Sequence, residues 1–280
     1  MNAHSIGRAA AKVTSIGGEA RVIGVTSRGL FLSIDQRVLF VSFERWRGPL
    51  TINVEWPVEC ATGEVVRLSA TRLIFPATEI DLSTAAVWRS PEPSASARPI
   101  ADQREALKHL ASSVLARKAP DGFGPLLPHL LDLPEKQALS ASEAALLARL
   151  IQLRDSLSDA AFDQATVLIE NLLGLGRGLT PSGDDVTIGF LLAVNRWRRN
   201  QNWRDLNQRV IDLAYQRTTT ISANLIECAT QDEADERLIN VVDGLVTGAP
   251  SLEECVDYVL DWGSSSGSDA LIGVTLALMM

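Results

Sequence analysis

The sequence predicts an α+β protein, with an N-terminal β-rich barrel or sandwich domain followed by a larger all-helical domain. The first ninety residues carry strand-like runs, a Pro/Ser/Ala-rich segment follows, and the remainder has apolar residues at helical spacing. A chain of 280 residues that is 46% hydrophobic and 21% charged has the composition of a folded protein able to bury a sizeable core. We therefore expect a β-rich domain at 1–90, a linker at 91–100 and a helical domain at 101–280.

The strand prediction comes from runs rich in Val, Ile, Leu, Phe and Thr, separated by Gly, Pro and polar turns. These runs are ARVIGVTSRGLFLSI, RVLFVSF, LTINVEW, EVVRLSA and RLIFPATEI. Trp46, Trp56 and Trp88 are expected to pack in the core of this domain or at its seam with the next one. A ligand-binding platform is the alternative use for these aromatic rings.

The helical part carries its own start and stop signals. Ser140 with Glu143, and Ser251 with Glu254, each have the Ser-x-x-Glu spacing of a capping box. Gly174 follows an amphipathic run and predicts a helix end.

Charge and cysteine content exclude several classes of protein. The formal net charge is −8, and the acidic excess lies after residue 90, so we expect no nucleic-acid binding. The basic, aromatic stretch NRWRRNQNWR at 195–204 is expected to place cations at the C-terminal end of a helix.

Three dispersed cysteines predict neither a disulfide framework nor a zinc site. No signal peptide and no run of about 20 apolar residues is present, so we expect a cytoplasmic protein without a membrane segment.

The stretch GLGRGLTPSGDD at 174–185 is the strongest functional signal. A helix is expected to begin at 181–184, because Pro is favoured in the first turn and Thr or Ser at the cap. The free N–H groups of that turn, the helix dipole and the preceding glycines together predict a site for a phosphate or carboxylate. The alternative is a tight turn with no ligand.

The two adjacent aspartates, Asp184 and Asp185, complicate a simple anion site because carboxylates repel anions. They could hold Mg²⁺ that bridges to the ligand, since Mg²⁺ prefers oxygen ligands. One of them could instead bond an amide or act as a general base. Both could also serve only to stabilise the helix N-terminus.

The C-terminal run SSSGSDALIGVTLALMM repeats this helix start. Ser182, Gly183, Asp185 and Ile188-Gly189 correspond at a constant offset to Ser266, Gly267, Asp269 and Ile272-Gly273. We therefore expect two helices that cross near Gly189 and Gly273 and bring Asp185 and Asp269 face to face. Two unrelated but similar helix starts are the alternative.

A third segment, RTTTISANLIECA at 217–229, is rich in hydroxyls that favour a helix start. Arg217 and Thr219 are candidates for contact with an oxyanion, and plain capping is the alternative. The sequence has no G-x-S-x-G, Walker or H-E-x-x-H motif, and His129 is expected to be a surface or packing residue.

The motif GLGRGLTPSGDDVTIGFLLA, together with RTTTISANLI and GSSSGSDALIGVTLAL, resembles a bacterial family once described as carboxylases and now associated with AllH, a subunit of oxamate carbamoyltransferase. The resemblance covers most of the chain. It implies a role in allantoin and purine breakdown, in which oxalurate and phosphate exchange with oxamate and carbamoyl phosphate and other subunits take part. Arg177, between two glycines, departs from the family pattern and could bind phosphate or carboxylate.

The residues that match the family motif, together with Arg177, Arg217 and Thr219, form the candidate site. The candidate catalytic residues are Asp184, Asp185 and Asp269, and Asp184 with Asp185 is the candidate Mg²⁺ site. The candidate substrate-binding residues are Gly176, Arg177, Gly178, Thr180, Ser182, Gly183, Arg217, Thr219, Ser266 and Gly267.

Three functions remain open at this point. The first is a carbamoyltransferase subunit that binds a small anionic substrate together with other subunits of a complex, or as a homo-oligomer. The second is a non-catalytic subunit that binds a metabolite or scaffolds its partners. The third is a carboxylase-like enzyme, although the chain offers no biotin-attachment Lys-Met context.

Overall fold

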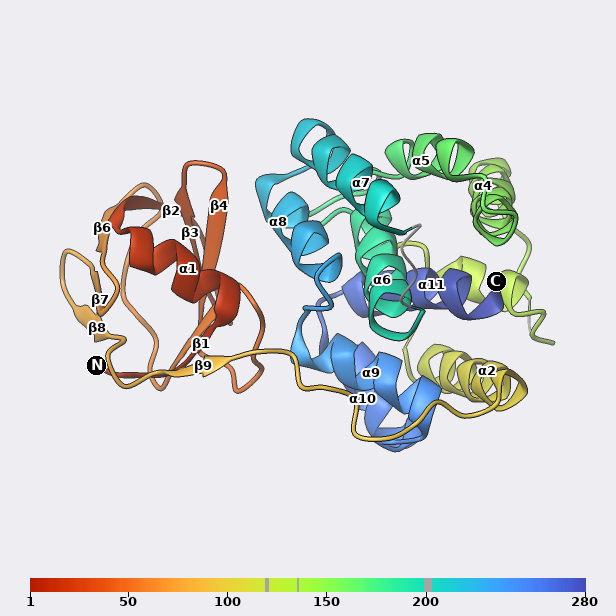
Figure 1. Cartoon of the computed structure of the whole chain (residues 1–280), viewed down its shortest axis with the longest axis horizontal. Coiled ribbons are helices and arrows are strands. Elements are labelled where there is room, and N and C mark those ends of the chain that lie inside the picture. Colours follow the sequence, from red (N-terminus) through yellow and green to blue (C-terminus); the bar gives the residue numbers. More distant parts are fainter. Residues whose placement is uncertain (119–120, 135, 199–202) are drawn as a thin grey trace. The chain divides into compact units, whose positions relative to one another are not determined.

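The computed structural model describes residues 1–118, 121–134, 136–198 and 203–280. The chain forms two compact units (Figure 1). The first comprises Met1–Pro91 with Glu233–Glu236, and the second comprises Glu92–Asp232 with Arg237–Met280. The first is built on a β-sheet and the second is helical, so the predicted α+β class is confirmed.

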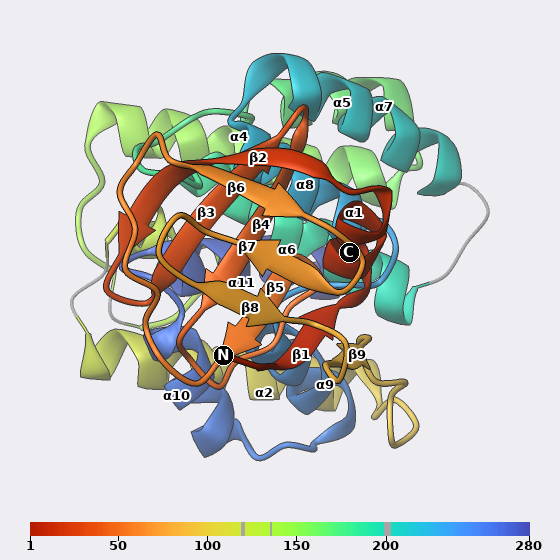
Figure 2. The same cartoon turned by 90° about the vertical axis from the view of Figure 1, so that its left-hand side faces the viewer.

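Within residues 1–91, nine strands form one curled sheet, a half-barrel rather than a two-sheet sandwich (Figure 2). The strands are β1 (Ala3–Gly7), β2 (Gly18–Thr26), β3 (Gly29–Ile34), β4 (Arg37–Ser42), β5 (Thr51–Val54), β6 (Val65–Leu68), β7 (Arg72–Ile74), β8 (Glu79–Asp81) and β9 (Ala86–Trp88). Their order in the sheet is β8-β7-β6-β2-β3-β4-β5-β1-β9. Most neighbours are antiparallel, and β4–β5 and β1–β9 are parallel. An isolated bridge from Asn2 to Asp81 adds a contact at β8, the edge strand opposite β9.

The prediction for this unit missed one helix, α1 (Arg8–Ile16). Its buried residues Ala10 and Val13 belong to the same apolar cluster as the inward-facing residues of the sheet, among them Leu30 and Ile52. The helix therefore shares the apolar core of the curled sheet. Burial of such apolar side chains is the main source of stability for the unit.

The three tryptophans of this unit differ in how far they are buried. Trp88 is buried and Trp46 is half-buried, as expected for residues that pack in the domain. Trp56 is 62% exposed, so the prediction that it packs in the core of this unit is wrong. Trp56 lies in the irregular segment after β5, where no strand pairing orients its side chain inward.

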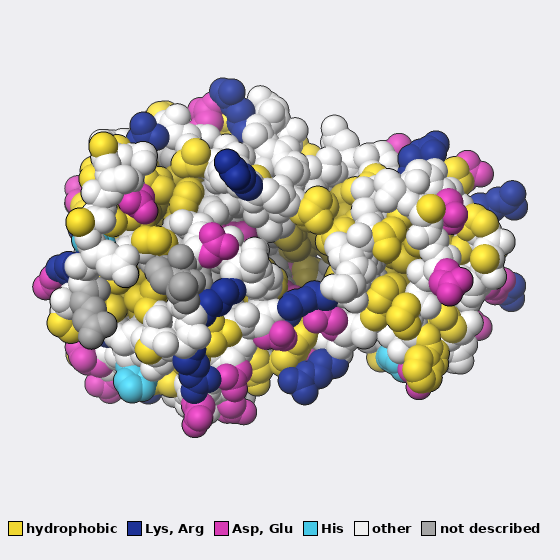
Figure 3. Space-filling view, turned by 180° about the vertical axis from the view of Figure 1, so that it is seen from behind, with side chains coloured by type: hydrophobic (Ala, Val, Ile, Leu, Met, Phe, Trp, Pro, Cys, Tyr) yellow, Lys and Arg dark blue, Asp and Glu magenta, His cyan; other side chains and the backbone are white. Residues whose placement is uncertain are grey.

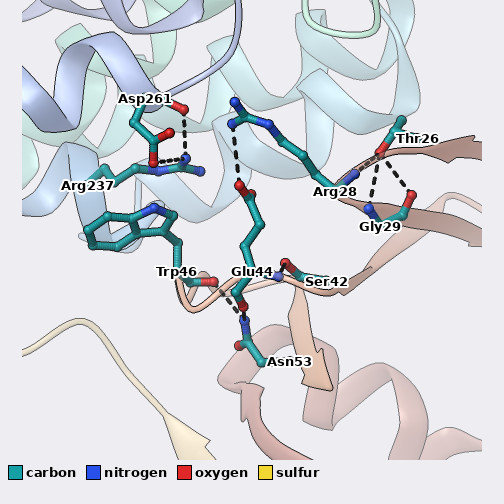
Figure 4. Close-up of polar contacts among 9 residues, drawn as sticks. All are labelled: Thr26, Arg28, Gly29, Ser42, Glu44, Trp46, Asn53, Arg237 and Asp261. Carbon is teal, nitrogen blue, oxygen red and sulfur yellow. Dashed lines mark hydrogen bonds and ion pairs between the residues drawn. The ribbon is translucent and has the colours of Figure 1, made fainter. Parts of the chain in front are cut away.

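A buried asparagine fixes the turn that carries Trp46 (Figure 4). Asn53 donates to the carbonyl oxygens of Glu44 and Trp46 at 2.9 and 2.8 Å and accepts from the Ser5 hydroxyl at 2.8 Å. Because each polar group of this side chain has a partner, its burial in β5 is not a penalty.

The second unit is built from helices. They are α2 (Ile100–Arg117), η1 (Gly124–Leu126), α3 (Leu127–Leu130), α4 (Ala141–Ser158), α5 (Phe162–Glu170), α6 (Ser182–Trp197), α7 (Trp203–Arg217), α8 (Thr220–Ala229), α9 (Glu236–Thr247), α10 (Leu252–Asp261) and α11 (Ser266–Met279). The capping boxes at Ser140 and Ser251 are both present, and both were predicted. None of the helices in the described ranges has the length and apolar character needed to span a membrane.

The two most buried helices, α6 and α11, pack against each other in the middle of this unit (Figure 1). Arg196, in the last turn of α6, is buried and holds Asp243 through two bonds of 2.6 and 2.7 Å and Asp232 through one of 3.0 Å. The expectation of a cation near the end of a helix is met by this residue, whereas residues 199–202 of the basic stretch lie outside the described residues.

Arg237, on α9, donates to the carbonyl and carboxylate oxygens of Asp261 (Figure 4). On the face of the molecule seen in Figure 3, acidic and basic side chains are interspersed.

Candidate functional site

The glycine-rich loop leads directly into α6, which begins at Ser182, inside the predicted range. Pro181 occupies the N-cap position, and the turn is closed by the Gly183 N–H, which donates to the Leu175 carbonyl at 2.8 Å. Gly176 has φ +125°, and a Cβ there would lie 2.6 Å from the Ser182 nitrogen. The loop therefore needs glycine at this position for conformation and for space.

Asp184 fixes the loop to a neighbouring helix junction. Its Oδ1 accepts from the Gly174 N–H at 2.8 Å, and its Oδ2 accepts from the Thr218 hydroxyl between α7 and α8. Burial raises the pKa of this carboxyl, while Thr218, Gly174 and Ser222 act in the opposite direction. Pro181 has no N–H to offer a capping-box partner, which leaves Asp184 free to reach across the loop.

The same contacts bear on the expected Mg²⁺ site at Asp184 and Asp185. Both oxygens of Asp184 already accept hydrogen bonds, so the two carboxylates do not offer a converging set of free oxygens. Within the described ranges, no group of three or more His, Cys, Asp or Glu side chains is arranged to hold a metal ion. The pair does not fit Mg²⁺ as it stands, and its metal binding stays a prediction.

The crossing of α6 and α11 occurs where the sequence predicted it. A Cβ on Gly189 would lie 2.1 Å from the Ala270 carbonyl oxygen, and one on Gly273 would lie 1.9 Å from that of Val186. The contact is reciprocal, because Val186 and Ala270 correspond to each other under the same offset that relates the two glycines. The helices thus approach backbone to backbone.

Gly183 and Gly267 play a matching part at the two helix starts. A Cβ on Gly183 would lie 1.9 Å from the Leu172 carbonyl oxygen, and one on Gly267 would lie 1.9 Å from that of Val259. The packing of each helix start against the preceding chain explains why glycine is needed at both positions.

Asp185 and Asp269 lie at these converging helix starts, and both are fully buried. Asp185 Oδ2 accepts from the Thr180 hydroxyl at 3.3 Å, and Asp269 Oδ1 accepts from the Phe123 N–H at 2.6 Å. Asp185 Oδ1 and Asp269 Oδ2 have no hydrogen-bond partner among the described residues. We call these two residues the buried aspartate pair.

Burial raises the pKa of both carboxyls, and it raises the pKa of Asp185 well above the usual range of an aspartate. The negative charge of Asp269 raises the pKa of Asp185 further, and Asp121 does the same for Asp269. Helix N-termini favour the charged form, but the effect of burial is larger. The aspartate pair therefore tends to keep a proton under conditions in which exposed carboxyls are ionised.

The serine at the start of each helix interacts with the aspartate of the other helix. The hydroxyl of Ser266, on α11, lowers the pKa of Asp185 on α6, and that of Ser182, on α6, lowers the pKa of Asp269 on α11. Thr180 Oγ1 also lies 3.4 Å from Ser266 Oγ. Thr180 and Ser266 are half-buried, so these two residues are the more accessible part of the cluster.

Gly122 and Phe123 belong to this site, and sequence reasoning missed both. Gly122 has φ +58°, and a Cβ there would lie 2.5 Å from Asp269 Oδ2, so the backbone packs directly on the carboxylate. Their distance in sequence from both motifs leaves no local pattern that could have indicated this contact.

The remaining predicted residues are placed differently. Arg217 forms an ion pair with Glu170 and its side chain is 58% exposed. Thr219 caps α8 by accepting from the Ser222 N–H at 3.1 Å and donates to the Leu179 carbonyl at 2.8 Å. Arg177 and Gly178 lie exposed in the glycine-rich loop. The structure thus gives Thr219 a capping role, while the aspartate pair with Thr180, Ser182 and Ser266 forms one cluster.

Residues 172–278 match the family described as oxamate carbamoyltransferase subunit AllH. The match supports the AllH-like assignment that the sequence predicted, and it covers the glycine-rich loop, α6, α8 and nearly all of α11. No solved structure matches the chain.

Proposed function

We propose that this chain is a subunit of a carbamoyltransferase that acts on small anions, and that the cluster at the starts of α6 and α11 binds the substrate. The reaction would exchange oxalurate and phosphate for oxamate and carbamoyl phosphate in the breakdown of allantoin. The observation that carries the proposal is the buried aspartate pair, held at two converging helix starts inside the segment that matches the family.

The ligand class follows from the electrostatics of the cluster. Helix N-termini and hydroxyl groups favour anions such as phosphate and carboxylate. Ionised aspartates would repel such ligands. The sequence raised this difficulty for Asp184 and Asp185, and it applies equally to Asp185 and Asp269. Because burial favours the protonated form of Asp185 and Asp269, this repulsion is reduced, and a protonated carboxyl can donate a hydrogen bond.

We propose a division of the candidate residues by role. Thr180, Ser182 and Ser266 are proposed to contact the anion, with the aspartate pair beneath them. Gly176, Gly183, Gly267 and Asp184 are proposed to hold the loop and helix starts in place. Arg177, exposed in the loop, is proposed to approach the ligand or a neighbouring subunit, since its guanidinium suits oxyanions.

Thermal unfolding of the purified chain tests ligand binding. Carbamoyl phosphate, oxamate or phosphate at 100 times its dissociation constant should stabilise the fold by about 2.7 kcal/mol, a shift of several degrees. Sulfate and bicarbonate serve as comparison anions. The stabilisation should be lost in Asp269→Asn and kept in Asp257→Asn, which alters an exposed carboxylate on α10.

Turnover separates the catalytic proposal from its alternatives. The chain assembled with its partner subunits should transfer the carbamoyl group, and Asp185→Asn should reduce that rate with folding intact. Ligand binding with a normal rate in Asp185→Asn would instead indicate a non-catalytic or scaffolding subunit. Product formation that requires bicarbonate would indicate the carboxylase alternative and contradict the proposal.

A further inference from the structure

The aspartate pair is an unusual feature to bury. Asp185 and Asp269 are fully buried, and each has an oxygen without a hydrogen-bond partner among the described residues. Apart from the pair itself, the charged groups that act on them among the described residues are Asp184 and Asp121, which are themselves acidic. Lys118 lies in the same region, but its ammonium group donates to the Ser264 carbonyl. Two buried negative charges without a cation are strongly unfavourable, and one proton removes most of that cost.

Asp185, one member of the pair, is connected to the half-buried residues of the cluster by hydroxyls. Thr180 Oγ1 lies 3.3 Å from Asp185 Oδ2 and 3.4 Å from Ser266 Oγ. Thr180 and Ser266 are half-buried residues, whereas Asp185 and Asp269 are not reached by solvent. A hydroxyl can accept one proton while it donates another, so this arrangement provides a path between the pair and a bound ligand.

We propose that Asp185 and Asp269 hold one proton between them, and that the hydroxyls of Thr180 and Ser266 pass it to the amide nitrogen released during carbamoyl transfer. This inference rests on the proposed function and assigns the source of the proton. Asp185 and Asp269 act through the hydroxyls, so they are positioning residues that store the proton.

The chemical step balances without an added reactant. An oxygen of hydrogen phosphate attacks the carbamoyl carbon and forms a C–O bond. The bond from that carbon to the amide nitrogen breaks, and its electron pair goes to the nitrogen. The nitrogen takes a proton from a hydroxyl, the aspartate pair replaces that proton, and the proton lost by hydrogen phosphate restores the pair. In the opposite direction, the pair accepts the proton of the attacking amide.

Infrared spectroscopy of the chain without ligand tests the stored proton. At neutral pH the wild-type chain should show a carboxylic-acid band, which an ionised carboxylate does not give. Asp185→Asn and Asp269→Asn should each change or remove this band, and Asp257→Asn should leave it unchanged. Absence of the band in the wild type would overturn the inference.

A matched pair of variants tests the path. Thr180→Val keeps the shape of the side chain but removes its hydroxyl, and Thr180→Ser keeps the hydroxyl. In the assembled complex, we expect the rate of carbamoyl release from oxalurate to fall about 10²-fold or more in Thr180→Val, the lower range of proton-transfer effects, and to be largely restored in Thr180→Ser. The wild-type rate should fall as the pH rises and the pair loses its proton, and Thr180→Val should lose this dependence.

The two proposals fail in different ways. An unchanged rate and pH profile in Thr180→Val would overturn the proton path even if the carboxylic-acid band is present. A wild-type complex that binds oxamate but gives no carbamoyl transfer would overturn the proposed function, and with it the catalytic use of the proton.

Discussion

The starts of α6 and α11 share one pattern, yet they are held in place differently. Each has a serine, a glycine packed on a carbonyl of the preceding chain and a buried aspartate. Asp184 on α6, however, has both oxygens hydrogen-bonded, whereas its counterpart on α11 is Ser268. The shared residues build the aspartate pair, and the additional aspartate fixes the glycine-rich loop. Two adjacent carboxylates in one motif therefore have separate tasks.

The helix crossing should be the most sensitive part of this arrangement. In Gly273→Ala, the added methyl would lie 1.9 Å from the Val186 carbonyl oxygen, where only backbone could move. We expect a loss of about 3 kcal/mol in the free energy of unfolding, the upper end of overpacking effects, and loss of ligand binding. Denaturant unfolding followed by circular dichroism measures this loss. Gly24→Ala is the control, since its nearest neighbour would be 3.7 Å away, and an equal effect in both variants would contradict the close crossing.

The second largest loss of stability is expected from removing Asp184, which holds the glycine-rich loop. Asp184→Ala leaves the Gly174 N–H and the Thr218 hydroxyl without their acceptor. We expect a loss of about 2 kcal/mol, because hydrogen bonds to a charged group are stronger than neutral ones. Hydrogen exchange of the Gly174 amide should rise in parallel. Asp155→Ala, at an exposed site on α4, should change stability little, and an Asp184→Ala chain as stable as the wild type would remove the anchoring role.

Substitution of the neighbouring Asp185 should raise stability rather than lower it. The pKa of Asp185 is raised by burial, so at neutral pH, where the unfolded carboxyl is ionised, this residue lowers the free energy of unfolding. Asp185→Asn removes the ionisable group and with it this destabilisation. We expect the midpoint of thermal unfolding to rise by a few degrees, on the order of 1 kcal/mol for a chain of this size, while carbamoyl transfer falls. A drop in the midpoint at neutral pH would show that the charged form of Asp185 is the stabilising one.

The exposed ion pair should matter least. Arg217→Gln breaks the contact with Glu170, but the arginine side chain is 58% exposed. We expect a change below about 1 kcal/mol in the free energy of unfolding, as for other surface pairs. Ligand affinity provides the second readout: a large loss of oxamate or carbamoyl phosphate binding would return Arg217 to the site as a direct contact.

The comparison of the two helix starts also shows what the sequence could reveal. The repeated Ser-Gly-x-Asp pattern and its constant offset predicted the crossing at Gly189 and Gly273, because close helix packing leaves a local signature of small residues. The contacts of Phe123 with Asp269 and of Thr218 with Asp184 left none, since they join segments far apart in the chain. The helix α1 was missed although Ala9, Ala10 and Ala11 are strong helix formers, because the surrounding strand pattern dominated the interpretation.

The most direct test of the aspartate pair is the pH dependence of unfolding. In an unfolded chain Asp185 and Asp269 both lose their protons near the ordinary pKa of 3.8, whereas burial keeps a proton on the pair in the folded chain to a higher pH. Over that interval the folded state binds more protons, so stability must fall as the pH rises. We predict that the free energy of unfolding of the wild type declines as the pH rises above the ordinary carboxyl pKa of 3.8, relative to an Asp185→Asn, Asp269→Asn double variant. Parallel curves for the two proteins would show that the folded chain holds no such proton.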